Sequence, residues 1–162
     1  MRFTLKKLHF LLAFAMVLLL LPATVWAKPV ISSDSNYFDI NTGRYILNGN
    51  VYVKTGDREI RAEHAQVSVV SLEVWGQGSV TVTQDDILFT GDTVYVSGRN
   101  RSATISGGVD FERTALSIKA ESVVFNWRTK IAEFSGNVNV NDHGNAYTAD
   151  TLRYDIRANQ IL

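Results

Sequence analysis

A short pattern recurs along this sequence at a constant interval of 29 residues. Gly-X-Val-X-Val/Phe begins at Gly49, Gly78, Gly107 and Gly136. A second signature, a small residue followed by an acidic one, keeps the same interval at Ser33-Asp34, Ala62-Glu63, Gly91-Asp92, Ala120-Glu121 and Ala149-Asp150. A fixed period of this length indicates one supersecondary unit that is stacked repeatedly. Residues 33–162 therefore contain four full units and a half.

Within each unit the apolar residues alternate with polar ones. Tyr45, Leu47, Val51 and Val53 share one parity in the first unit, which is the period of a half-buried strand. The parity slips at the small-acidic pair, between Ala62 and the following apolar positions. One extra residue there is typical of a β-bulge, which bends a strand and lets it cross from one sheet to a facing one.

Turn-forming residues occur twice per unit, as at Asn41-Thr42-Gly43 and Thr55-Gly56-Asp57. Two reversals per unit predict an antiparallel meander of strands of roughly ten residues. The fold class is therefore all-β. A solenoid whose strands all run in one direction is the alternative geometry. At Val70-Ser71-Leu72 the turn signal is weak, and the pattern does not indicate how the chain reverses.

The first 27 residues have the composition of a signal peptide. Positive charge at Arg2, Lys6 and Lys7 precedes the apolar run from Phe10 to Leu21, and Val25-Trp26-Ala27 offers small residues for cleavage before Lys28. Retention of residues 8–25 as a membrane anchor is the alternative. Removing the segment takes away three of 16 basic residues and none of the 16 acidic ones, which leaves a net charge of −3. A nucleic-acid-binding protein should be basic, so that class is disfavoured.

The sequence lacks the constellations that catalysis or metal binding requires. His64 and His143 occupy different columns of the repeat and stand outside any known catalytic motif. The acidic column is as regular as the repeat itself, so we expect these carboxylates to accept backbone N–H bonds at the bulges. We therefore expect no enzyme activity, no metal and no cofactor. The absence of cysteine excludes a disulfide framework.

The repeated Gly-Asn-Val-Tyr-Val and Ala-Glu/Asp units resemble those of the LptA/OstA family of lipopolysaccharide (LPS) export proteins. The resemblance covers residues 33–162, with Ala62-Glu63, Ala120-Glu121 and Ala149-Asp150 among the matching pairs. It implies a single OstA-like domain over residues 28–162, folded as a slightly twisted antiparallel β-jellyroll, V-shaped in section and open at both ends. It also implies a periplasmic protein whose interior takes lipid A acyl chains.

The resemblance further implies partners. Members of the family stack head to tail between an inner-membrane LptC-like protein and an outer-membrane LptD-like protein. A membrane-anchored LptC-like member of the same pathway is the nearest alternative. Outside the pathway, the alternative is a structural β-scaffold with a dry, fully packed core.

The inward parity of successive strands defines a candidate lipid-binding column. Its members are Phe38, Val51, Val67, Phe89, Val96, Phe111, Ile118, Phe125, Phe134, Val138 and Tyr147. An open V-shaped section would leave these side chains as a long apolar groove, which an acyl chain could fill. Arg99, Arg128 and Arg157 recur on one turn edge, and we expect them to contact the phosphates of the lipid head group.

Overall fold

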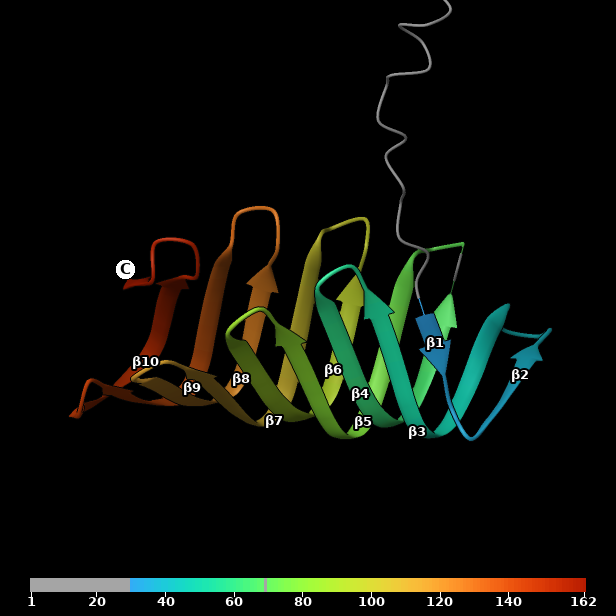
Figure 1. Cartoon of the computed structure of the whole chain (residues 1–162), viewed down its shortest axis with the longest axis horizontal. Coiled ribbons are helices and arrows are strands. Elements are labelled where there is room, and N and C mark those ends of the chain that lie inside the picture. The colour runs from blue at the N-terminus through green and yellow to red at the C-terminus, as the bar shows by residue number, and fades with distance from the viewer. Residues whose placement is uncertain (1–29, 69) are drawn as a thin grey trace, which may run out of the picture.

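In the computed structural model, which describes residues 30–68 and 70–162, the chain forms one antiparallel sheet of eleven strands (Figure 1). The strands are β1 (Val30–Ser32), β2 (Ser35–Asp39), β3 (Arg44–Thr55), β4 (Arg58–Ser68), β5 (Glu73–Gln84), β6 (Ile87–Ser97), β7 (Ser102–Arg113), β8 (Leu116–Asn126), β9 (Ile131–Asp142), β10 (Asn145–Asp155) and β11 (Gln160–Ile161). Strands β3 to β11 pair in sequence order, and β1 and β2 both pair with β3. The predicted antiparallel all-β meander is confirmed.

The predicted signal peptide lies outside the described residues. Within those residues, no helix is long and apolar enough to cross a membrane.

Each long strand is interrupted near its middle, where the register between neighbours shifts. The interruptions divide the sheet into two halves, which we call the first and the second wing. The first wing consists of residues 44–48, 64–68, 73–77, 93–97, 102–106, 122–126, 131–135 and 151–155. The second wing consists of residues 51–55, 58–61, 80–84, 87–90, 109–113, 116–120, 138–142 and 145–149. Because every long strand bends at the same place, the sheet folds into a trough (Figure 1).

The bend is built from two consecutive residues with positive φ. Gly49 and Asn50 have φ of 72° and 46°, and the pairs that begin at Gly78, Gly107 and Gly136 repeat this conformation. Glycine adopts positive φ without steric cost, which explains why it recurs every 29 residues. The interruption therefore involves the Gly-X pair of one strand as well as the small-acidic pair of the next, where the sequence predicted the bulge.

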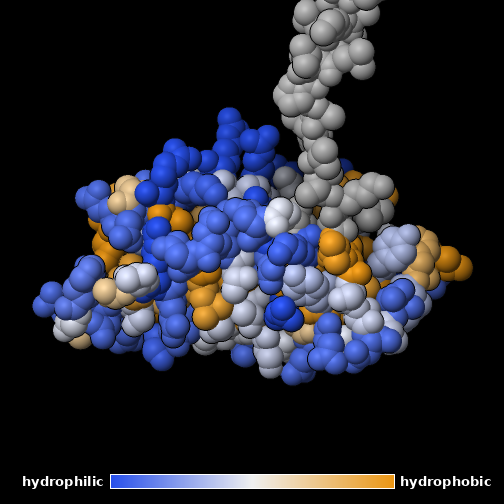
Figure 2. Space-filling view, in the orientation of Figure 1, coloured by the Kyte–Doolittle hydropathy of each residue, from blue (hydrophilic) through white to orange (hydrophobic). Residues whose placement is uncertain are grey.

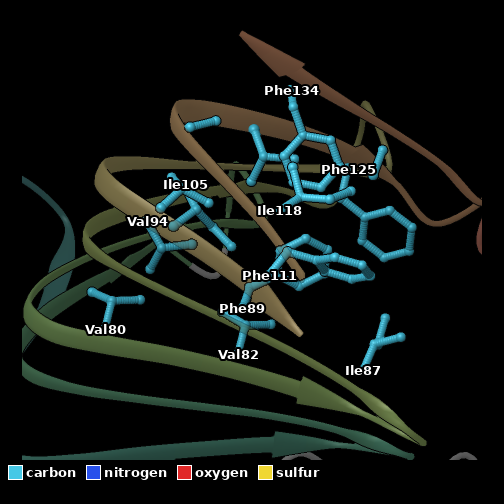
Figure 3. Close-up of a cluster of buried hydrophobic side chains, with 14 of the residues drawn as sticks. Val80, Val82, Ile87, Phe89, Val94, Ile105, Phe111, Ile118, Phe125 and Phe134 are labelled. Carbon is cyan, nitrogen blue, oxygen red and sulfur yellow. The ribbon is translucent and has the colours of Figure 1, made fainter. Parts of the chain in front are cut away.

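The concave faces of the two wings form one apolar core. The most deeply buried side chains include Phe111, Ile118 and Val138, each 0% exposed. They come from alternate positions of successive strands, as the two-residue period predicts. Figure 3 shows Phe89 and Phe111 of the second wing packed toward Phe125 and Phe134 of the first.

Candidate functional site

The structure places nine of the eleven predicted lipid-binding residues inside the trough. Eight of these nine are buried, namely Val51, Val67, Phe89, Phe111, Ile118, Phe125, Phe134 and Val138, and Val96 is half-buried. Phe38 and Tyr147 are 49% and 43% exposed, and they lie toward opposite ends of the sheet, on β2 and β10. The inward column therefore runs from one end of the trough to the other and emerges at both ends.

Contacts between the wings fill the middle of the trough. The ring centroids of Phe89 and Phe125 are 5.9 Å apart, and those of Phe111 and Phe134 are 5.6 Å apart. Each of these pairs joins the second wing to the first. Where the sequence suggested an open groove, the side chains of the two wings thus occupy the space themselves. An acyl chain in this part of the trough would have to replace wing-to-wing contacts.

The N-terminal end of the trough is open. A hollow of about 260 Å³ is lined there by Ile31, Tyr45, Leu47 and Val67 together with the polar residues Ser32, Ser33 and Asn36. Two of its apolar lining residues, Ile31 and Tyr45, are each 44% exposed. Figure 2 shows hydrophobic surface at both ends of the molecule. A solvent-exposed apolar surface of this kind marks a binding or association site.

The turns of the two wings form two rims of opposite charge along the mouth of the trough. The rim of the first wing carries Arg99, Arg101, Arg128, Lys130 and Arg157, and that of the second wing carries Asp57, Asp85 and Asp86. All three arginines predicted to contact a head group lie on the first rim. The Arg99 side chain donates a hydrogen bond of 3.3 Å to the carbonyl of Val70, one turn away.

Arg113 ties the two rims together. It ends β7 on the second wing and forms an ion pair of 2.7 Å with Asp86. Its guanidinium also donates to the Tyr154 hydroxyl at 3.0 Å and to the Ile156 carbonyl at 2.5 Å, both of which belong to the first-wing side. Burial alone would lower the pKa of Arg113, but the bonds to Asp86 and Tyr154 offset this and raise it. The guanidinium is therefore charged and fully engaged in the closed trough.

Sequence reasoning missed the polar residues at the inward edge of the second wing. Arg58, Gln84 and Arg113 occupy inward positions, and the Arg58 guanidinium lies 5.0 Å from the ring of Trp127 on the opposite rim. Comparison of equivalent positions in the repeat could have identified Arg58. The residues 29 and 58 positions later, Ile87 and Leu116, are apolar and buried, so a charged residue departs from its column.

The acidic column packs against the glycine column of the next strand. A Cβ atom on Gly49, Gly78, Gly107 or Gly136 would lie within 2.4 to 2.6 Å of a carboxylate oxygen of Asp34, Glu63, Asp92 or Glu121. Asn50 donates to Asp34 at 2.9 Å, and Asn137 donates to Glu121 at 2.6 Å. The hydrogen bonds found for the carboxylates thus come from side chains rather than from the backbone N–H groups we expected. The described residues contain no cluster of three or more acidic, histidine or cysteine side chains suited to a metal ion.

Another hollow lies on the outer face of the first wing. Its volume is about 440 Å³, and it is lined mainly by outward residues that include His64, Trp75, Gln77 and Tyr95. Arg44 covers the Trp75 ring at 4.0 Å. Because these positions alternate with the inward ones, the hollow is separate from the predicted lipid-binding column.

Comparison with known proteins agrees with this architecture. Residues 30–71 and 70–160 match the model of the family described as "LptA/(LptD N-terminal domain) LPS transport protein". The fold is similar to the crystal structure of LptH from Pseudomonas aeruginosa, described as the LptA-homologous periplasmic component of the conserved lipopolysaccharide transport device. That match has a TM-score of 0.63 at 14% sequence identity and covers 67% of this chain and 82% of that one. A search of curated proteins gave no significant match.

The family match extends over most of the sequence and over all the repeats, and the fold agrees with a solved relative of the same transport system. The β-jellyroll that the resemblance implied is therefore confirmed. The chain belongs to the LptA/(LptD N-terminal domain) LPS transport protein family.

Proposed function

We propose that this protein is a non-catalytic periplasmic carrier that holds the acyl chains of LPS in its trough and bridges the inner and outer membranes. The observation that carries the proposal is the inward apolar column, which spans the sheet from Phe38 on β2 to Tyr147 on β10 and is exposed at both ends. A column that continues to both ends can pass its ligand to a neighbour.

The energetics of acyl burial fit such a carrier. Each methylene removed from water contributes roughly 0.8 kcal/mol, so one chain of a dozen carbons offsets the loss of several aromatic contacts. The lipid would enter at the hollow beside Leu47 and Val67 and part the wings as it advances. Since the driving force is apolar burial, transfer along the column needs no covalent chemistry.

The ends of the sheet support assembly with related proteins. β1 and β2 at one end and β10 and β11 at the other present strand edges, and such edges are templates for pairing with another chain. We propose head-to-tail association of copies, with an LptC-like protein at the inner membrane and an LptD-like protein at the outer membrane as the terminal partners. Residues 1–27 would act as a signal peptide that is removed on export.

Site-specific photo-crosslinking tests the lipid-binding proposal. A photoreactive phenylalanine analogue at Phe125, which points into the trough and is 5% exposed, should label LPS in cells. The same analogue at Val124 is the matched control, because Val124 is the adjacent residue on the outer face and is 41% exposed. Equal labelling at both positions, or none at Phe125 in a folded protein, would contradict the proposal.

Two alternatives make different predictions. A structural scaffold is favoured by the packed contacts between Phe89 and Phe125, and it would purify from periplasm without lipid. Native mass spectrometry of the purified protein separates the two functions, because only a carrier retains lipid. An LptC-like anchored protein would keep its first residues, and N-terminal sequencing distinguishes it from a chain that begins at Lys28.

A further inference from the structure

Arg58 occupies an inward position at the mouth of the trough, where the next two units place an apolar side chain and the fourth places Asn145. It begins β4, and Ile60 follows it on the same face of the second wing. Its equivalents in the next two units, Ile87 and Leu116, are 4% and 6% exposed. A guanidinium in this column loses hydration without the ion pair that would compensate it, which is costly unless something else does so.

The contacts of Arg58 leave its charge without a carboxylate. The guanidinium lies 5.0 Å from the centre of the Trp127 ring, on the opposite rim. Its Nε atom is buried and has no hydrogen-bond partner. Among residues 30–68 and 70–162, no acidic side chain lies within ion-pair distance of it. This contrasts with Arg113, whose guanidinium is held by Asp86, Tyr154 and Ile156.

Gln84 places a hydrogen-bond acceptor without a partner next to the unpaired Nε donor of Arg58. It is the antiparallel partner of Arg58 across β4 and β5, so the two side chains stand side by side on the inward face. Gln84 is 6% exposed, and its Nε2 atom donates to Asp57 at 2.8 Å. Its Oε1 atom is buried and has no partner. Buried polar atoms without partners are rare in folded proteins, so a donor and an acceptor that lie side by side without partners mark a candidate binding site.

We propose that Arg58 and Gln84, with Trp127, form the site that recognises the phosphorylated sugar head group of the carried lipid. The phosphate would accept hydrogen bonds from the guanidinium, and an adjacent sugar hydroxyl would donate to Oε1 of Gln84. The apolar core begins at the neighbouring positions Ile60 and Val82, so acyl chains attached to the same sugar lie within reach of it. The turn that holds Trp127 also holds Arg128 and Lys130, so the basic rim faces Arg58 across the mouth. This assignment rests on the proposed function and gives the head group a more specific site than the turn arginines alone.

The charges around the site set the orientation of the ligand. Asp57, Asp85 and Asp86 on the second rim repel a phosphate from the solvent side of that wing. The first rim, with Arg128 and Lys130, attracts it. The anion is therefore directed to the inner edge of the mouth, between the two wings.

Binding of paired lipid probes to the full mature chain tests the site. The probes are a bis-phosphorylated, acylated glucosamine disaccharide and the same lipid after enzymatic removal of both phosphates. We expect the wild type to prefer the phosphorylated probe by about tenfold or more, and Arg58→Leu to lose this preference while binding the dephosphorylated probe as the wild type does. Arg58→Lys should retain part of it, because the charge remains while the Nε donor is lost.

Arg61→Leu is the matched control. Arg61 lies on the same strand and stacks on an aromatic ring, that of Tyr52 at 4.6 Å, but it points outward. Arg61→Leu removes the same positive charge as Arg58→Leu, but from outside the trough. It should therefore leave the preference for the phosphorylated probe unchanged. An unchanged preference in Arg58→Leu, or no preference in the wild type, would overturn the site while leaving the carrier intact. Failure of the wild type to bind either lipid would overturn the carrier itself.

A third probe separates a lipid head group from a free sugar phosphate. Water-soluble glucosamine 6-phosphate should compete with the phosphorylated lipid only at concentrations at least about a hundredfold higher, because it gains no acyl burial. Competition at a concentration equal to that of the lipid would contradict a lipid head-group site and assign Arg58 to a soluble sugar phosphate.

Discussion

At the residue scale, the bend of the sheet depends on a contact between two columns of the repeat. Each glycine of the Gly-X pair has positive φ and lies against the carboxylate of an acidic residue 15 positions earlier, as Gly136 does against Glu121. The acid is held in turn by the side chain after the glycine, Asn137 in this unit. The two signatures therefore recur with one period because each requires the other.

Glycine is favoured at position 136 both by its positive φ and by the nearby Glu121 carboxylate, and two alanine substitutions separate these effects. Gly144, at the β9–β10 turn, has φ of 86° and no atom within 4 Å of an added Cβ, so Gly144→Ala should cost only the backbone strain, about 1 to 2 kcal/mol. Gly136→Ala should cost at least about 1 kcal/mol more, because the new Cβ displaces Glu121 from Asn137. Urea unfolding measures both values. Equal losses would show that the carboxylate contact contributes nothing.

Stability should fall in acid through a small number of carboxylates. Hydrogen bonds from Ser71 and then Tyr95 hold the pKa of Glu73 below its usual value of 4.5, and a hydrogen bond from Lys54 lowers that of Glu59. Since these pKa values are lower in the folded state, their stabilisation is complete above pH 4.5 and is lost as the pH falls through the folded-state values.

Glu73→Gln should therefore lose stability at pH 7 but show a smaller further loss of stability between pH 5 and pH 3 than the wild type. Urea unfolding at several pH values measures the difference. Asp85→Asn is the control, because Asp85 is exposed on a turn and makes no side-chain hydrogen bond within the described part of the chain. A wild-type pH dependence in Glu73→Gln would contradict the assignment.

At the scale of strands and turns, periodicity predicted most of the fold. The two-residue alternation located the inward positions, and the 29-residue interval located the bends, because both are repeated in every unit. The turn at Val70-Ser71-Leu72 could not be predicted: Leu72 adopts φ of 59°, and its carbonyl accepts the N–H of Gly98 from the next turn. That turn is stabilised by its neighbour in the stack as well as by the hydrogen bond of 3.2 Å from the Ser71 N–H to the Ser68 hydroxyl.

The inward column was predictable for the same reason, but its packing was not. Parity shows that Phe89 and Phe125 face the same interior, whereas the distance between the wings depends on side chains far apart in sequence. The polar residues Arg58, Gln84 and Arg113 at the mouth were not predicted, because a repeat identifies only the positions whose character recurs in every unit. Arg58 is informative because it departs from the column of Ile87 and Leu116.

The terminal strands should control association. β11 contains only Gln160 and Ile161 and pairs with β10 at Tyr154 and Asp155, so it extends the C-terminal edge. Ile161→Pro removes an N–H group and should raise the concentration needed for self-association by about tenfold. Sedimentation velocity over a range of concentrations measures this. The unfolding midpoint of the variant should stay close to that of the wild type, because so few residues are involved. A wild type that remains monomeric at high concentration would contradict head-to-tail pairing.

At the scale of the whole molecule, the two wings are joined like a hinge at the bend. Contacts at the mouth and in the apolar core both hold the wings together. The bend joins the two wings in the middle of each long strand, and the opposite rims carry charges of opposite sign. Arg113 links those rims through Asp86 and Ile156. These contacts between the wings would have to be released for a lipid to enter through the mouth. On the proposed carrier function the trough has to open at the mouth, whereas a scaffold has no need to.

Covalent closure of the mouth tests this consequence. Asp86→Cys and Arg157→Cys introduce thiols on opposite rims of one hollow, in a chain that has no other cysteine. Joining them with a short, cleavable bis-maleimide should abolish lipid uptake, and cleavage of the linker should restore it. A pair on a single rim, Asp57→Cys with Asp85→Cys, is the control and should take up lipid normally when linked. Normal uptake by the chain linked across the mouth would show that the wings do not part, and that lipid reaches the column only from its open ends.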